Sequence, residues 1–252
     1  MNGRVWGCRI ALTALCAAVT GSLVLNTQRM VGAQTRSPAS ESDQVVLAIA
    51  SRLPRGAISL YSGKAEDLSA NWYRRGTQSP PNWTVSGDGI ATPRGTDITS
   101  KQEFGDCYLH VEFREPTDAN GNPVASGNSG VGLQGRYEIQ ILNSYGSRPE
   151  RHGCGALYSQ KAPRVNASKK VGEWQSFDIV FRAPRLDASG QVTEQPRLTL
   201  FQNGVLIQNN ESFNGPTGIQ YGDFRGQPPT GPLVLQGDHD PVQFRNIWIV
   251  PL

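Results

Sequence analysis

The chain of 252 residues lacks the short motifs of several large enzyme classes. It contains no GxSxG nucleophile elbow, no HExxH zinc motif and no GxxxxGK[ST] phosphate-binding loop. Long helical periodicity is also missing, and no segment repeats at a fixed period. These absences argue against an α/β-hydrolase, a zincin protease, a P-loop nucleotide hydrolase and a helical repeat protein.

Cysteine is scarce, with four residues in the whole chain, and two of them lie in the first 33 residues. The remaining pair, Cys107 and Cys154, forms no CxxC motif, which excludes a zinc cluster or a CxxC redox site. In an oxidising compartment the two thiols could pair as a disulfide. The alternative of two buried free thiols stays open.

The first 33 residues have the composition of an export signal. Arg4 and Arg9 precede an uncharged, mostly apolar run from residue 10 to residue 25, and small residues end the segment at Ala33. We therefore predict a cleavable signal peptide, residues 1–33, and a periplasmic or secreted protein. A membrane anchor is the competing interpretation, but the apolar run is shorter than the ~20 residues that span a bilayer.

Net charge is low once this segment is set aside. The full chain has 24 basic and 21 acidic residues, and the signal contains three arginines and no acid. The predicted mature chain therefore carries 21 residues of each sign. Nothing in this balance indicates a nucleic-acid partner, which would need a basic face, and no stable membrane span is expected after signal removal.

Short strands punctuated by turns dominate the rest of the chain. Apolar and polar residues alternate with a period of two, as is typical of half-buried strands. Asn203-Gly204 is a strong two-residue hairpin motif. The sequence therefore predicts an all-β, single-domain sandwich or jelly roll, with strands over 107–114, 136–141, 174–181, 197–202, 205–207, 233–236 and 242–250.

Two of these strands have polar faces rich in directed hydrogen-bonding groups. We expect the strands to pair antiparallel across the 115–128 loop, so that their polar side chains form one open surface that binds substrate. The ordinary alternative is a solvated outer face. The residues of this predicted surface are His110, Glu112, Arg114, Arg136, Glu138 and Gln140.

A second polar cluster precedes the last strand. Gln236 begins a Gln-Gly-Asp-His-Asp sequence. Its His239 could act as a base or as a metal ligand, or the cluster could be only a tight polar turn. Asn128 stands at a strand entrance with little side-chain bulk around it. We predict Glu112, Glu138 and His239 as catalytic residues, and the amides of Asn128 and Gln236 as further substrate-binding groups.

Several long motifs in order resemble the 3-keto-disaccharide hydrolase domain family. They include KQEFGDCYLHVEFR at 101–114, GNSGVGLQGRYEIQILNSYG at 127–146 and GPLVLQGDHDPVQFRNIWIVPL at 231–252. The resemblance covers residues 57–252, which we take as the domain, after a linker and short segment at 34–56. At the last motif the family more often has a shorter His-Gly turn.

The resemblance implies a concanavalin-like jelly-roll β-sandwich that cleaves disaccharides or glycosides oxidised to a ketone at C3. The ketone acidifies the proton on C2, so cleavage can proceed by proton abstraction, elimination and hydration, or by direct hydrolysis with two carboxylates. A non-catalytic carbohydrate-binding module is the alternative function. The expected partner is a small carbohydrate; no cofactor or metal ligand set is predicted, and a divalent cation stays open.

Overall fold

The computed structural model describes residues 53–219 and 225–252. The predicted signal peptide, residues 1–33, and all but the last few residues of the predicted linker lie outside the described residues. Within the described part of the chain, no helix has the length and apolar character needed to cross a membrane.

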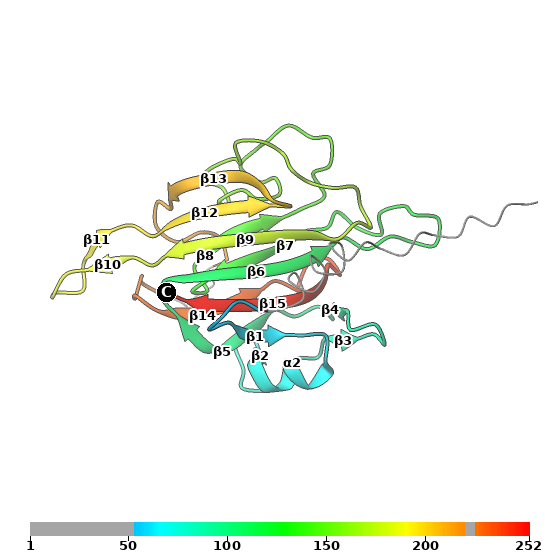
Figure 1. Ribbon diagram of the computed structural model, residues 1–252, viewed down its shortest axis with the longest axis horizontal. Coiled ribbons are helices and arrows are strands. Elements are labelled where there is room, and N and C mark those ends of the chain that lie inside the picture. Colours follow the sequence, from blue (N-terminus) through cyan, green and yellow to red (C-terminus); the bar gives the residue numbers. More distant parts are fainter. Residues whose placement is uncertain (1–52, 220–224) are drawn as a thin grey trace, which may run out of the picture. The chain divides into compact units, whose positions relative to one another are not determined.

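Eight antiparallel strands form the larger sheet. Its path runs β13-β12-β9-β6-β15-β4-β3, and β1 also pairs with β15 (Figure 1). The C-terminal strand therefore lies inside the sheet between β6 and β1, as the sequence predicted. The strands are β1 (Ile58–Tyr61), β3 (Thr84–Val85), β4 (Ala91–Thr92), β6 (Cys107–Arg114), β9 (Gln175–Arg182), β12 (Arg197–Gln202), β13 (Val205–Ser212) and β15 (Gln243–Pro251).

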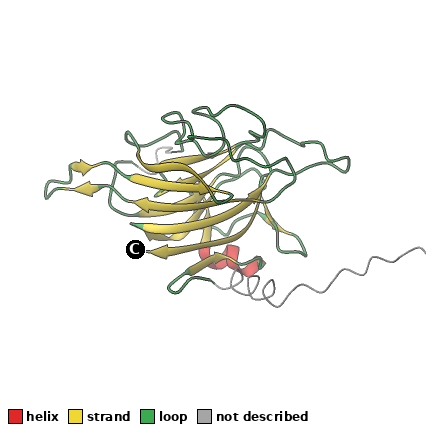
Figure 2. Cartoon of the chain, turned by 45° about the horizontal axis from the view of Figure 1, so that its top comes forward, coloured by secondary structure: helices red, strands yellow, loops and turns green. Residues whose placement is uncertain are grey.

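A second sheet has five antiparallel strands in the order β2-β5-β14-β7-β8. Figure 2 shows that strands and loops make up nearly all of the described chain, with one short helix, α2 (Ala65–Asn71). The second sheet contains β2 (Trp72–Arg74), β5 (Ile98–Phe104), β7 (Ser129–Leu133), β8 (Tyr137–Ile141) and β14 (Gly231–Leu235), and a separate ribbon contains β10 (Arg185–Leu186) and β11 (Val192–Glu194).

The core lies between the two sheets. Alternate residues of β6 are buried, and so are alternate residues of β9. Tyr137 of the five-stranded sheet meets Phe181 of the eight-stranded sheet, with ring centroids 5.8 Å apart. This two-layer packing buries the apolar face of each sheet and confirms the all-β, concanavalin-like sandwich.

The predicted Asn203-Gly204 hairpin is confirmed. Both residues have positive φ, 54° and 79°, as a two-residue type I′ turn requires. Gln202 of β12 lies opposite Val205 of β13 across this turn. The Asn203 side chain also accepts a hydrogen bond from the Ser176 backbone N–H at 2.9 Å, which ties the turn to β9.

The predicted pairing of the 107–114 and 136–141 strands is wrong. β6 pairs with β9 and β15 in the eight-stranded sheet, whereas β8 pairs with β7 in the five-stranded sheet. The reason is β7, whose Ser-Gly-Val-Gly-Leu sequence has too much glycine to resemble a strand. β7 follows the 115–128 loop and takes the position beside β8 that we had expected β6 to take.

The two cysteines of the described chain are separate, buried thiols. Burial raises the pKa of Cys107 and of Cys154 to about 12. The alternative of two free thiols therefore holds, and the disulfide alternative is wrong. Both side chains belong to the apolar core.

Candidate active site

A hollow of about 170 Å³ lies on the outer face of the five-stranded sheet, which we call the Glu138 hollow. In β8, Tyr137, Ile139 and Ile141 face the core, so the alternating side chains must point away from it. The hollow brings together five predicted site residues from β8 and two loops, joined by Tyr158 and Gly218. The five are Asn128, Glu138, Gln140, Gln236 and His239.

This face is covered, not open as the sequence suggested. Glu138 is 2% exposed, and Gln140 and Gln236 are also buried. Both faces of β8 are therefore covered, one by the core and the other by the loops that surround the hollow. A carboxylate in such a place has lost most of its water, which changes its chemistry.

Gly130 of β7 makes room for the functional side chains. A Cβ atom at this position would lie 2.7 Å from Glu138 Oε1 and 3.0 Å from Gln236 Oε1. Gln236 Oε1 is buried without a hydrogen-bond partner among the described residues. A buried carbonyl oxygen without a partner is costly, so this atom is suited to accept a hydrogen bond from a ligand.

Glu138 has the protonation behaviour of an acid–base group. Burial raises its pKa to about 7, and the carboxylates of Asp97 and Asp238 act in the same direction. A hydrogen bond from Gln236 and the positive charge of Arg75 oppose the rise. A pKa near neutrality lets the carboxyl take up and release a proton at physiological pH.

Amide side chains lie next to this carboxyl. The Gln140 amide is 3.1 Å from Glu138 Oε1 and 3.1 Å from Asn128 Oδ1. Asn128 is itself held in place by Asp240, whose carboxylate accepts hydrogen bonds from the Asn128 backbone N–H at 2.8 Å and from the Ser126 hydroxyl at 2.6 Å. The hollow thus has polar groups in fixed positions around one titrating carboxyl.

A buried carboxylate fixes the loop that carries Gln236 and His239. Asp97 Oδ1 accepts hydrogen bonds from the backbone N–H groups of Gly237 and Asp238, at 2.9 and 3.3 Å. Its other oxygen pairs with Arg75 at 3.1 Å. Burial raises the pKa of Asp97, and the nearby Asp238 carboxylate adds to the rise. His239 itself lies at the rim, with its side chain 42% exposed.

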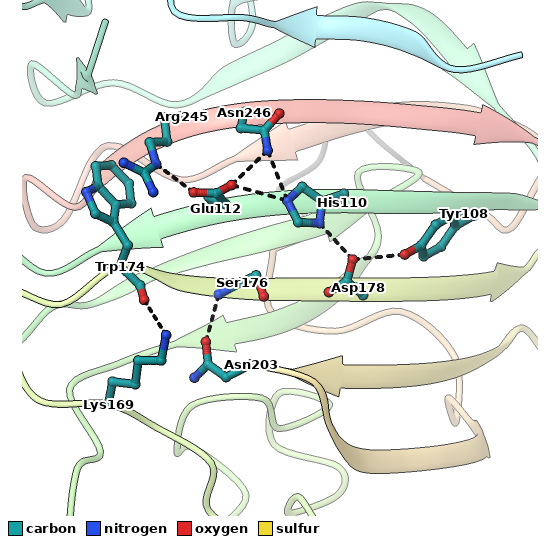
Figure 3. Close-up of polar contacts among 10 residues, drawn as sticks. All are labelled: Tyr108, His110, Glu112, Lys169, Trp174, Ser176, Asp178, Asn203, Arg245 and Asn246. Carbon is teal, nitrogen blue, oxygen red and sulfur yellow. Dashed lines mark hydrogen bonds and ion pairs between the residues drawn. The ribbon is translucent and has the colours of Figure 1, made fainter. Parts of the chain in front are cut away.

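Glu112 and His110 lie on the opposite outer face of the sandwich. Both project from β6 of the eight-stranded sheet, away from the core (Figure 3). Burial disfavours the Glu112 charge, but hydrogen bonds from His110, Asn246 and Arg245 outweigh it and lower its pKa to about 2. The prediction of one site that contains both Glu112 and Glu138 is therefore wrong, because the two strands belong to different sheets.

The two predicted arginines also lie outside the Glu138 hollow. The Arg114 Nε donates to Gln243 Oε1 at 2.8 Å, and its guanidinium lies 4.7 Å from the Trp174 ring centroid. Arg136 is buried, and its Nε donates to the backbone carbonyl of Gly226 at 3.0 Å. Arg136 therefore ties a loop to the sheet, contrary to the predicted exposed face.

Sequence reasoning missed the residues behind the hollow. Arg75 and Asp97 come from strands or loops with no recognisable motif, and Tyr158 lies in a loop. Alternation identifies outward side chains, but it cannot show which distant loop folds over them. No group of three or more His, Cys, Asp or Glu side chains in the described residues is arranged to hold a metal ion.

The fold and the hollow define a class: a concanavalin-like β-sandwich protein with a buried carboxyl, of raised pKa, under its loops. Residues 56–250 match the family described as the 3-keto-alpha-glucoside-1,2-lyase-like domain. This match spans most of the chain, so the chain belongs to that family, as its motifs indicated.

Solved structures show the same architecture. A "putative glycosyl hydrolase" from Parabacteroides distasonis is 34% identical, with a TM-score of 0.67, over 79% of this chain and 85% of that chain. A second structure from that organism, with the same description, is 18% identical with a TM-score of 0.57, over 80% of this chain and 98% of that chain, and shows the fold alone. No curated protein sequence matches this chain.

Proposed function

We propose that this protein cleaves the glycosidic bond of 3-keto-glycosides in the Glu138 hollow. Membership of the 3-keto-alpha-glucoside-1,2-lyase-like family supports a carbohydrate-cleaving enzyme. The observation that carries the proposal is a carboxyl group, 2% exposed, whose pKa burial raises to about 7 beside a hollow lined by amides.

Glu138 acts as the base that removes the proton from C2 of the oxidised sugar. The ketone at C3 accepts the electron pair as an enolate, and the bond from C1 to the leaving oxygen then breaks. A base with a pKa near 7 is matched to this task at neutral pH. The desolvated site also strengthens each hydrogen bond to the developing charge.

The amides orient the substrate and hold the enolate oxygen. Gln140 supplies an N–H donor beside Glu138, and Asn128 lines the hollow next to it. Gln236 Oε1 accepts a hydrogen bond from a sugar hydroxyl, which gives this orphaned atom the partner that it lacks in the described structure. His239, at the rim, gives a proton to the leaving oxygen. The hollow, of about 170 Å³, is smaller than the roughly 300–1,000 Å³ typical of small-ligand sites, so we expect it to hold the reacting sugar while the leaving group stays outside.

A second carboxylate at glycosidase spacing does not line the hollow. Glu138 is the one Asp or Glu among its lining residues, which all belong to the described chain. Ordinary retaining hydrolysis needs two carboxyl groups about 5 Å apart, and inverting hydrolysis needs about 6.5–9.5 Å. This lining favours elimination followed by hydration. We further propose that the enzyme works outside the cytoplasm, after removal of the predicted signal peptide.

The test is incubation of the protein with a 3-keto-disaccharide and with the same disaccharide unoxidised, in D₂O. We expect cleavage of the oxidised sugar only, with deuterium at C2 of the product, followed by NMR. Equal cleavage of both sugars, or cleavage without deuterium at C2, would refute elimination. Binding of the oxidised sugar without turnover would show a carbohydrate-binding module instead.

A further inference from the structure

The outer face of the eight-stranded sheet has a larger hollow, of about 350 Å³, that the proposed reaction does not use. We call it the Glu112 hollow. Side chains from β6, β9 and β15 surround it, together with Lys169 and Trp174 from the segment before β9 (Figure 3). Its size falls in the range of small-ligand sites, about 300–1,000 Å³.

Three of the four titratable or charged side chains that line this hollow are cationic. Burial disfavours charge on His110, but hydrogen bonds to Asp178 and Glu112 outweigh it and raise the pKa of His110 to about 9, so the ring is charged at neutral pH. Lys169 and Arg245 add two further cations. Glu112 is the one carboxylate among the lining residues, all of them in the described chain.

That carboxylate has little capacity left for a ligand. Glu112 Oε2 accepts from Arg245 Nε at 2.6 Å, and Oε1 accepts from Asn246 Nδ2 at 2.7 Å. His110 Nε2 lies 3.6 Å from the same Oε1, while its Nδ1 bonds Asp178 at 2.7 Å. The network holds Glu112 ionised and holds its partners in place, so Glu112 serves to position the cations.

Arg245 and Lys169, in contrast, keep free donors, whereas both ring nitrogens of His110 are engaged. Arg245 uses Nε for Glu112, and its two terminal nitrogens have no hydrogen-bond partner among the described residues. The guanidinium is braced by the Trp174 ring, 4.0 Å from its centroid. Lys169 Nζ donates one of its three N–H groups to the Trp174 carbonyl, at 2.9 Å. The paired guanidinium donors of Arg245 fit a carboxylate. Figure 3 shows the Lys169 ammonium on the other side of Trp174, where it can meet a second anionic group.

Hydroxyl and amide groups complete the lining. Ser176 and Asn203 also line the hollow. The Asn203 amide is fixed, because it donates to Gln175 Oε1 and to the Ala167 carbonyl. It also accepts a hydrogen bond from the Ser176 backbone N–H. The Ser176 hydroxyl has no hydrogen-bond partner among the described residues and is available to a ligand. Gln175 is itself held by the buried Glu115, whose two oxygens accept from its amide at 3.2 and 3.1 Å. Neutral polar groups of this kind recognise sugar hydroxyls, which a simple inorganic anion does not have.

We propose that the Glu112 hollow is a second, non-catalytic binding site for a saccharide that carries a carboxylate, such as a uronic acid. Arg245 holds the carboxylate of one sugar, Lys169 holds the carboxylate of a neighbouring sugar, and the Ser176 hydroxyl meets a sugar hydroxyl. Because the site lies on the other face of the sandwich from Glu138, it anchors the enzyme to an acidic glycan without blocking the reaction.

The test is calorimetric titration of the full protein with trigalacturonate, with maltotriose and with inorganic sulfate. We expect trigalacturonate to bind, with Lys169→Met weakening it about tenfold, the loss of one charge-assisted contact. Lys170→Met is the matched control, because this neighbour removes the same charge but points toward Tyr145, 5.9 Å from its ring centroid. It should bind as tightly as wild type.

Four results would overturn the proposal. Trigalacturonate could fail to bind. Maltotriose could bind equally well, which would show that the site does not recognise a carboxylate. Sulfate could displace trigalacturonate at equal concentration, which would leave only an anion site. Glu138→Gln could abolish binding, which would place the ligand in the other hollow. The Glu138→Gln titration also separates this proposal from the reaction, because that variant should lose turnover and keep trigalacturonate affinity.

Discussion

Replacing Glu138 by Gln should change how the stability of the protein depends on pH. The Glu138 pKa rises from the ordinary 4.5 to about 7 in the folded protein, so the folded state binds the proton more tightly than the unfolded state. Stability from this group is therefore present below pH 4.5 and lost as the pH rises through about 7. At about 1.4 kcal/mol for each pH unit, the loss is about 3 kcal/mol, most of it between pH 5 and pH 8.

Glutamine stays neutral, so Glu138→Gln should lose none of this stability. Urea unfolding followed by tryptophan fluorescence at pH 5 and pH 8 measures the difference between variant and wild type. The free energy of unfolding of the variant minus that of wild type should be about 2–3 kcal/mol larger at pH 8 than at pH 5.

Glu112→Gln is the matched control. Its pKa in the folded protein is lowered to about 2, so its contribution is present above the ordinary 4.5 and lost only as the pH falls toward 2. Since Glu112 also supports the raised pKa of His110, the Glu112→Gln difference should change between pH 5 and pH 8 only through His110, and by less than the Glu138→Gln difference. A constant difference for Glu138→Gln would refute the claim that burial raises the Glu138 pKa.

Three further predictions follow from the same contacts. Gly130→Ala should lower turnover about 100-fold, because the added Cβ atom would displace Glu138 and Gln236. Gly87→Ala should leave turnover unchanged, because its added Cβ atom would have no neighbour within 4 Å. Steady-state rates of the folded variants measure the difference. The kcat/KM of wild type should rise with pH through about 7, as the base ionises, and Asp97→Asn should move that rise to lower pH by removing a charge that raises the Glu138 pKa; unchanged profiles would exclude this coupling. In the chain without residues 1–33, Cys107 and Cys154 should react with a thiol reagent only after unfolding, and a count below two thiols per unfolded chain would contradict the free pair.

Local alternation predicted most of the eight-stranded sheet, because its strands are half-buried and show a period of two. β6, β9 and β12 have this pattern and were found at their predicted positions. The five-stranded sheet was harder to predict, since strands covered on both faces lose the contrast between inside and outside. β7 could not be predicted because two of its five residues are glycine. The helix α2 could not be predicted because seven residues are too few to show a helical period.

Part of the candidate site could be predicted from local sequence patterns. The polar face of β8 and the Gln236–His239 turn were found from the chain, and the structure brings them together. Assigning Glu112 to the same centre failed because strand pairing depends on long-range contacts that no local pattern contains. Only tertiary structure could show that Arg75 and Asp97 lie behind Glu138.

The central claim is that chemistry occurs at Glu138 and not at Glu112. The most direct measurement is the cleavage rate of a 3-keto-disaccharide by Glu138→Gln and by Glu112→Gln, each shown to be folded. We expect Glu138→Gln to lose at least about 100-fold in kcat, the lower range for a general base, while Glu112→Gln stays within a few-fold of wild type. Near-normal turnover in Glu138→Gln, or the larger loss in Glu112→Gln, would contradict it.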